Sequence, residues 1–128
     1  MNKSRKIIPS LYAILLLFLG ITLLLALRPV PKANMNNCIK ISGNVIRVDE
    51  GGGQSDIIID IQGDDSYYYI NRGLEMGINL KEMQIALINE SAELFYIKHW
   101  TPLDPGNKSR HVARVACKGE VFYNEMSK

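Results

Sequence analysis

An uninterrupted apolar run from Ile7 to Leu27 constrains this chain more than any other feature of its sequence. The run has 21 residues and none of them is charged. A helix rises 1.5 Å per residue, so this length spans about 31 Å, which matches the hydrocarbon core of a bilayer. We therefore predict a single transmembrane helix over residues 7–27, which leaves residues 38–128 to fold in water.

The flanks of this run predict its use and its orientation. Residues 1–6 form a short basic flank, which is typical of both signal peptides and membrane anchors. The run is longer than the core of a usual signal peptide and no small-x-small cleavage pattern follows it, so we favour an uncleaved anchor over a cleaved signal. More cations precede the run than follow it, which predicts a cytoplasmic N-terminus and an extracytoplasmic domain at the cell membrane. Residues 28–37, with Pro29 and Pro31, are predicted to form an extended tether.

The charge of the chain divides unevenly between the anchor and the domain. The whole chain has 15 Lys and Arg against 13 Asp and Glu, a net charge of +2. Five of the cations lie in residues 1–37 and all thirteen acids follow, so residues 38–128 carry a net charge of −3. Nucleic-acid binding draws much of its affinity from neutralising phosphates, so an acidic domain disfavours that function. About 90 residues are enough for one small domain with one core.

Alternation of apolar and polar residues predicts a domain built mainly from strands. Ile57, Ile59 and Ile61 share one face, which is typical of a strand with one buried side. Gly43 interrupts the first strand and predicts a bulge or a bend. Asn79 is placed to cap a helix, with Glu82 as its capping-box partner. The predicted strands are 38–49, 56–62, 67–70, 92–100 and 111–117, with a helix at 80–88 and a short final strand or strand extension at 121–124.

This order of three strands, a helix and two strands over residues 38–124 resembles the oligonucleotide/oligosaccharide-binding barrel, the OB fold. The resemblance is one of architecture, and it implies a mainly β fold, a β-barrel with one helix. In the chain, the predicted transmembrane helix precedes this barrel. Another small antiparallel barrel, or an open α+β sheet with one helix, is the alternative fold. The resemblance also implies that ligands would meet the face of the second and third strands, between the loops after strands one and four.

Three side chains of the third strand and its end are candidates for binding a ligand at that face. Tyr67 and Tyr69 lie on one side of the strand, where they can stack on sugars or bases or act as cross-strand partners, and we favour the second role. Arg72 can pair with Glu75 at the barrel rim or bind an anion. The glycines at 51–53 lack the helix and the lysine of a phosphate-binding loop, so we predict a hairpin loop there.

A second group of candidates surrounds the loop after the fourth strand. His99, Asp104 and His111 invite comparison with a metal site, but their spacing fits no standard site and no third nitrogen or sulfur ligand is near them in the sequence. We predict that Trp100 packs against the barrel end and that Asp104 accepts hydrogen bonds within a turn. We predict no metal and no cofactor.

Cys38 and Cys117 stand near the two ends of the domain. An even number of cysteines in an exported domain permits a disulfide, which would close a large loop. Two free thiols are equally consistent with the sequence, and both alternatives stay open.

Together these features predict a single-pass membrane-anchored protein whose exported OB-like domain binds a protein or glycan partner at the cell envelope. We identify no nucleophile with a base and no paired carboxylates, so we predict that it is not an enzyme. One alternative is a small metal-assisted hydrolase that uses His99, Asp104 and His111. The other is a module that binds single-stranded nucleic acid through Tyr67, Tyr69 and Arg72.

Overall fold

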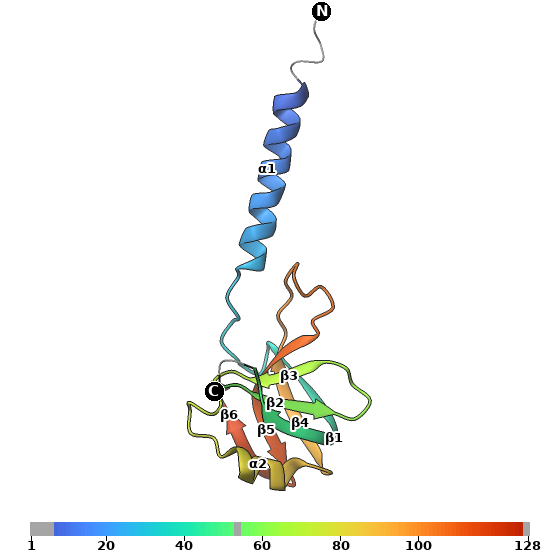
Figure 1. The fold of residues 1–128 in the computed structure, drawn as a ribbon, viewed down its shortest axis with the longest axis vertical. Coiled ribbons are helices and arrows are strands. Elements are labelled where there is room, and N and C mark those ends of the chain that lie inside the picture. The colour runs from blue at the N-terminus through green and yellow to red at the C-terminus, as the bar shows by residue number, and fades with distance from the viewer. Residues whose placement is uncertain (1–6, 53–54, 127–128) are drawn as a thin grey trace, which may run out of the picture.

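The computed structural model describes residues 7–52 and 55–126, with side chains from Ser10 onward. The predicted basic flank at 1–6 and part of the glycine loop, at 53–54, lie outside the described residues. The domain is mainly β, and these described residues contain two helices (Figure 1). Its elements are α1 (Ile7–Ala26), β1 (Cys38–Glu50), β2 (Ile57–Ile61), β3 (Tyr67–Ile70), α2 (Leu80–Leu87), β4 (Ser91–Ile97), β5 (Ser109–Cys117) and β6 (Glu120–Asn124).

Five of the strands close into a mixed barrel. β1 pairs antiparallel with both β2 and β4, β2 pairs with β3, and β4 pairs with β5. The barrel closes where β3 runs parallel to β5, with Tyr67 opposite Ser109 and Tyr69 opposite His111. β6 adds to β5 beyond the closed ring. This closed barrel is compatible with the predicted OB-like architecture.

β1 contributes to both halves of the barrel because it bends near Gly43. Residues 38–44 pair with β4, whereas β2 pairs with residues from Val45 onward, and the register shifts between Val45 and Arg47. A Cβ atom at Gly43 would lie 2.5 Å from Cγ2 of Ile61, a distance that real Cβ atoms do not show. Glycine therefore leaves the room that the Ile61 side chain fills, and the irregularity predicted at Gly43 is present as the register shift that follows it.

The barrel interior is filled by aliphatic side chains from the strands and from α2. Ile57, Ile59 and Ile61 are all buried, which confirms the predicted inward face of β2. Met83 and Leu87 of α2 belong to the same core. Burying each such side chain contributes about 1.5–3 kcal/mol, so this core supplies most of the driving force for folding.

A local signal sets the start of α2, whereas pairing with distant strands sets the end of β4 and the start of β5. The Oδ1 atom of Asn79 accepts the N–H of Glu82 at 3.2 Å, so the predicted cap is confirmed. β4 ends at Ile97, three residues before the predicted Trp100, because its pairing with β1 ends where β1 begins. β5 begins two residues earlier than predicted, since its first residues pair with β3.

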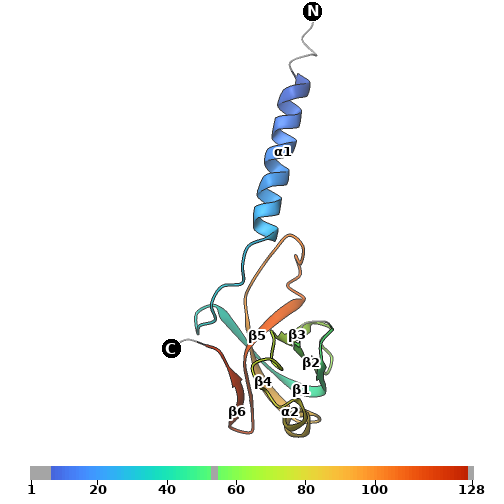
Figure 2. The same ribbon diagram turned by 60° about the vertical axis from the view of Figure 1, so that its left-hand side comes forward.

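α1 extends away from the barrel as a single helix, and residues 28–34 join the two without helix or strand (Figures 1 and 2). The helix itself occupies the apolar run, ending one residue before Leu27. Within the described part of the chain, however, none of the helices combines the length and the apolar character that crossing a bilayer requires. The transmembrane crossing is therefore not supported by the structure and stays a prediction from the sequence.

Candidate functional site

The outer face of β3 and β5 carries a row of aromatic rings. Tyr67 and Tyr69 are stacked, with ring centroids 5.7 Å apart and an interplanar angle of 28°. On its other side Tyr69 meets His111 of β5, with ring centroids 5.5 Å apart. Because the parallel register puts Tyr69 opposite His111, these two residues are cross-strand partners. Tyr67 is the ring that stays most open to solvent, at 43% exposed.

The loop between β1 and β2 lies beside Tyr67, at one end of this row. A Cβ atom at Gly51 would lie 3.2 Å from both the Tyr67 hydroxyl oxygen and Cγ2 of Ile58. Ile58 alternates with the inward-facing side chains of β2, yet it is buried as well. The backbone at Gly51 lies beside it, which gives this outer face a small apolar layer of its own.

A carboxylate from the C-terminal segment completes the other end of the row. Nε2 of His111 lies 2.6 Å from Oε1 of Glu125, and the hydroxyl of Tyr123 donates a 2.7 Å hydrogen bond to Oε2. Burial alone would raise the pKa of Glu125, but these two hydrogen bonds outweigh it and hold that pKa below its usual value. Burial and the same carboxylate raise the pKa of the Tyr123 phenol. The contacts with His111 and Tyr123 therefore favour the ionised form of the Glu125 carboxyl group.

A cavity of about 450 Å³ lies between this row and the tether, and we call it the tether cavity. Ala33 of the tether is buried against Ile97 and Ala113 of the barrel, so the tether forms a docked wall. The cavity has an apolar part from Val30, Pro31, Ala33 and Ile97, and polar groups from Lys32, Asn71, His111 and Glu125 beside the ring of Tyr69.

Sequence reasoning named Tyr67, Tyr69 and His111 but missed Glu125. The signal that locates it is the hairpin of β5 and β6, which folds residue 125 back beside residue 113. The backbone N–H of Glu125 donates to the carbonyl of Ala113 at 2.8 Å, two residues from His111. The register of this hairpin shifts between Val115 and Ala116, so a plain count from Gly119 would have placed residue 124 rather than Glu125 opposite Ala113.

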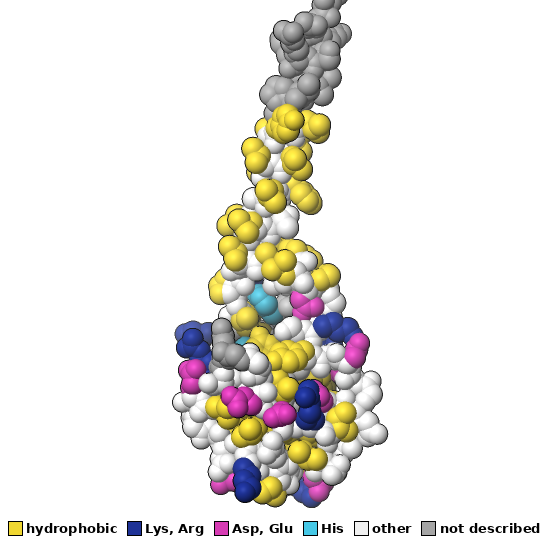
Figure 3. Space-filling view, viewed as in Figure 1, with side chains coloured by type: hydrophobic (Ala, Val, Ile, Leu, Met, Phe, Trp, Pro, Cys, Tyr) yellow, Lys and Arg dark blue, Asp and Glu magenta, His cyan; other side chains and the backbone are white. Residues whose placement is uncertain are grey.

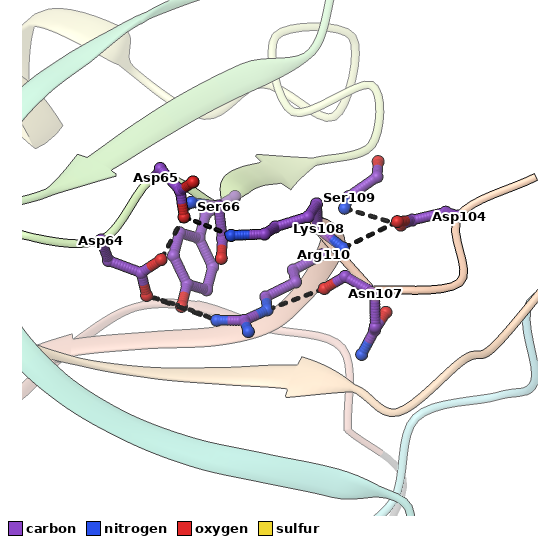
Figure 4. Close-up of polar contacts among 9 residues, drawn as sticks. Asp64, Asp65, Ser66, Asp104, Asn107, Lys108, Ser109 and Arg110 are labelled. Atoms are coloured by element: carbon purple, nitrogen blue, oxygen red, sulfur yellow. Dashed lines mark hydrogen bonds and ion pairs between the residues drawn. The ribbon is translucent and has the colours of Figure 1, made fainter.

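The loop after β4 uses Asp104 internally, as predicted (Figure 4). Oδ1 of Asp104 accepts the N–H of Lys108 at 2.9 Å and Oδ2 accepts the N–H of Ser109 at 2.8 Å. These two bonds lower the pKa of Asp104. Trp100 was predicted to pack against the barrel end, and this prediction is wrong. It lies beyond the end of β4 and its side chain is 51% exposed.

His99, Asp104 and His111 show no sign of a shared metal site. The carboxylate of Asp104 accepts hydrogen bonds from backbone N–H groups, and Nε2 of His111 lies 2.6 Å from Glu125. Nδ1 of His99 is buried and has no hydrogen-bond partner among the described residues. Across residues 7–52 and 55–126, no three residues of the types His, Cys, Asp and Glu are grouped to hold a metal ion.

Arg72 lies at the end of β3 in the left-handed region, with φ of 52°. Its backbone N–H donates to Oδ1 of Asp56 at 2.7 Å, which ties the end of β3 to the residue before β2. Its Nε lies 3.9 Å from Oε2 of Glu75, so the predicted ion pair is present. Both side chains are exposed, and such a pair contributes little to stability.

A polar cluster that the sequence did not reveal lies where β3 meets β5 (Figure 4). The guanidinium of Arg110 lies over the rings of Tyr96 and Tyr68, 4.6 Å and 5.2 Å from their centroids. The same group contacts the Tyr68 hydroxyl and lies 3.3 Å from Oδ2 of Asp64, while its Nε donates to the carbonyl of Asn107 at 3.0 Å. This cluster joins two strands and the loops beside them, which is a structural role.

Cys38 and Cys117 are free thiols. Cys38 lies opposite Ile97 at one end of β4, and Cys117 lies opposite Ala92 at the other end. Five residues of strand correspond to roughly 17 Å, whereas a disulfide needs Cα atoms within about 7 Å. Of the two alternatives that the sequence left open, the structure has the two free thiols.

No protein-family model matches this chain, and neither the curated proteins nor the solved structures gave a significant match. The fold and the site define a class on their own: a mainly β closed barrel, compatible with an OB-like barrel, that carries an aromatic and carboxylate row beside a docked tether.

Proposed function

We propose that this protein is a membrane-anchored module that binds a protein or glycan partner at the cell envelope, and that the tether cavity is the binding site. The observation that carries the proposal is the tether cavity itself. It brings Lys32 and Asn71 to one concave surface with the His111–Glu125 pair. Binding sites are typically concave and mostly apolar, with a few polar groups that orient the ligand.

The polar groups of the cavity are better suited to binding than to reaction. Nε2 of His111 lies 2.6 Å from one oxygen of the Glu125 carboxylate, and Tyr123 occupies the second oxygen. Lys32 and Asn71 are exposed and can donate to a sugar hydroxyl or to a peptide carbonyl. The net charge of −3 on residues 38–128 disfavours a nucleic acid as the partner.

The surface of α1 supports the anchor. Its large apolar side chains from Leu11 to Leu25 are exposed on every side, and Figure 3 shows apolar atoms along the helix above the barrel. A helix that is apolar all round is normally buried, and here the barrel does not cover it. We propose that lipid covers α1, with the N-terminus in the cytoplasm and the barrel outside.

The proposal is tested on the full chain by affinity capture after mild crosslinking and detergent solubilisation of membranes. Asn71→Trp places a large side chain at the mouth of the cavity without touching the barrel core, and Lys81→Trp makes the same kind of change on exposed α2. We expect the wild type and Lys81→Trp to recover the same protein or glycan species, and Asn71→Trp to lose it. Capture that is unchanged in Asn71→Trp would rule out the tether cavity as the site.

The anchor is tested separately by fractionation and protease protection of intact cells. We expect the chain in the membrane fraction and the barrel accessible to protease from outside. A chain recovered entirely in the soluble fraction would contradict the anchor.

A further inference from the structure

We infer that the β4–β5 loop, residues 98–108, inserts its apolar tip into the surface of the same membrane that holds α1. The inference rests on the proposed anchor and adds a second contact with lipid. Figures 1 and 2 show the loop from two directions 60° apart, and in both it leaves the barrel on the side of α1 and reaches toward the C-terminal end of that helix. α2 lies at the opposite end of the barrel in both views.

The side chains of this loop have the chemistry of a membrane interface. Leu103 is 79% exposed and Trp100 is 51% exposed, although both are large and apolar. Tryptophan is enriched at the boundary between hydrocarbon and water, where its ring is buried and its N–H stays wet. Lys98 at the start of the loop is exposed and can meet anionic headgroups.

The exposure of these side chains does not come from a loop without structure. The N–H of Asp104 donates to the carbonyl of Thr101 at 3.1 Å, and the N–H of Asn107 donates to the carbonyl of Asp104 at 3.0 Å. The Asp104 carboxylate holds the returning chain through Lys108 and Ser109. The loop is thus shaped by its own polar groups, which leaves the apolar side chains free for a partner.

The position of the loop indicates that its binding partner is lipid. If α1 stands in a bilayer, its C-terminal end marks the outer surface, and a loop that reaches toward this end meets the headgroups.

Trp100 is the only tryptophan of the chain, so its fluorescence reports on the loop directly. The full chain is reconstituted in vesicles of phosphatidylcholine and phosphatidylglycerol, with or without bromine atoms on the acyl chains, and floated on a density gradient. We expect Trp100 of the floated protein to emit at a shorter wavelength than Trp100 in a water-exposed peptide of residues 98–108. We also expect the brominated lipid to quench its fluorescence. Leu103→Asp should lose both effects, whereas Ile85→Asp on α2, at a position that is 76% exposed, should keep them.

The outcomes separate this inference from the anchor. Flotation without quenching overturns the loop insertion and leaves the anchor standing. Loss of quenching in Ile85→Asp as well as in Leu103→Asp also overturns the insertion, because the effect would then not depend on the loop. A chain that does not float overturns both the anchor and the insertion that rests on it.

Discussion

The hydroxyl of Tyr68 donates a 2.6 Å hydrogen bond to Oδ2 of Asp64, inside the seam that closes the barrel. Tyr68 is buried on β3, and the guanidinium of Arg110 on β5 contacts both partners. β3 and β5 pair over only three opposed residue pairs. We infer that this polar contact, together with the rings under the guanidinium, contributes much of the free energy that stabilises the pairing of β3 with β5.

Tyr68→Phe tests this role. The ring stays in its edge-on contact with Tyr96, but Asp64 and Arg110 lose a partner at a partly buried position. We expect the free energy of unfolding to fall by about 1–2 kcal/mol, measured by urea unfolding of the full chain in detergent. Tyr67→Phe, which removes a hydroxyl from the exposed neighbouring ring, should change it by less than about 0.5 kcal/mol. Equal losses in the two variants would contradict the proposed role of the seam.

Stability should depend on acid through Asp64. Burial would raise the pKa of this carboxyl, but hydrogen bonds from Tyr68 and Ser66 and the charge of Arg110 outweigh it and lower the pKa from 3.8 to about 2. A pKa that is lower in the folded state stabilises the fold above pH 4, and this stabilisation is lost as the pH falls toward 2. The side chain is 30% exposed, so solvent screening leaves about 1 kcal/mol.

The measurement is the free energy of unfolding of the wild type and of Asp64→Asn between pH 7 and pH 2. Other carboxylates titrate in both proteins, so the difference between the two isolates Asp64. We expect this difference to be constant above pH 4 and to shrink below it. A difference that does not change with pH would show that the ionised carboxylate is not what stabilises the seam.

The bend of β1 gives a prediction about packing. Gly43→Ala adds a methyl group 2.5 Å from Cγ2 of Ile61, so we expect a loss of about 1–3 kcal/mol in unfolding free energy. Ile61→Ala removes that atom, and in this background the cost of Gly43→Ala should fall clearly. Gly52→Ala is the matched control, since a Cβ there meets nothing within 4 Å. A cost that is the same in both backgrounds would mean that the clash is not with Ile61.

The fold could be predicted where its signals are local. The alternation at residues 57–61, the cap at Asn79 and the glycine at position 43 each act within a few residues, and each was confirmed. The end of β4 was missed for the opposite reason. Alternation continues in the sequence as far as Trp100, but the strand ends at Ile97 because residues 35–37, which precede its partner strand, form a turn.

The site was less predictable because its contacts join distant segments. Tyr69 and His111 were named separately, but their contact depends on the parallel register of β3 and β5, which the residues of either strand do not encode. Asp64 and Arg110 are 46 residues apart in the chain. The turn around Asp64 already accounts for an aspartate at that position, so nothing in the sequence indicated a contact with Arg110. Glu125 follows the last strand, where the sequence offers no periodic pattern to place it.

The C-terminal segment should depend on the charge of Glu125. Glu125→Gln keeps the size of the side chain but removes the ionised acceptor of His111 and Tyr123. We expect a loss of about 1 kcal/mol and faster amide hydrogen exchange in β6, because the bond that ties this strand to the barrel face is weakened. Glu120→Gln, at the exposed start of β6, should leave exchange unchanged. Protection of β6 that persists in Glu125→Gln would show that backbone pairing alone holds the strand.

The two thiols should differ in accessibility and should not be linked. Cys117 is buried, whereas Cys38 is partly exposed, so an alkylating reagent should label Cys38 in the native protein and Cys117 only after unfolding. Burial raises the pKa of the Cys38 thiol, and labelling should therefore accelerate at a higher pH than for a free cysteine. Mass spectrometry of the wild type, Cys38→Ser and Cys117→Ala assigns each label. In urea without a reducing agent both thiols of the wild type should react, and a requirement for prior reduction would show that they form a disulfide after all.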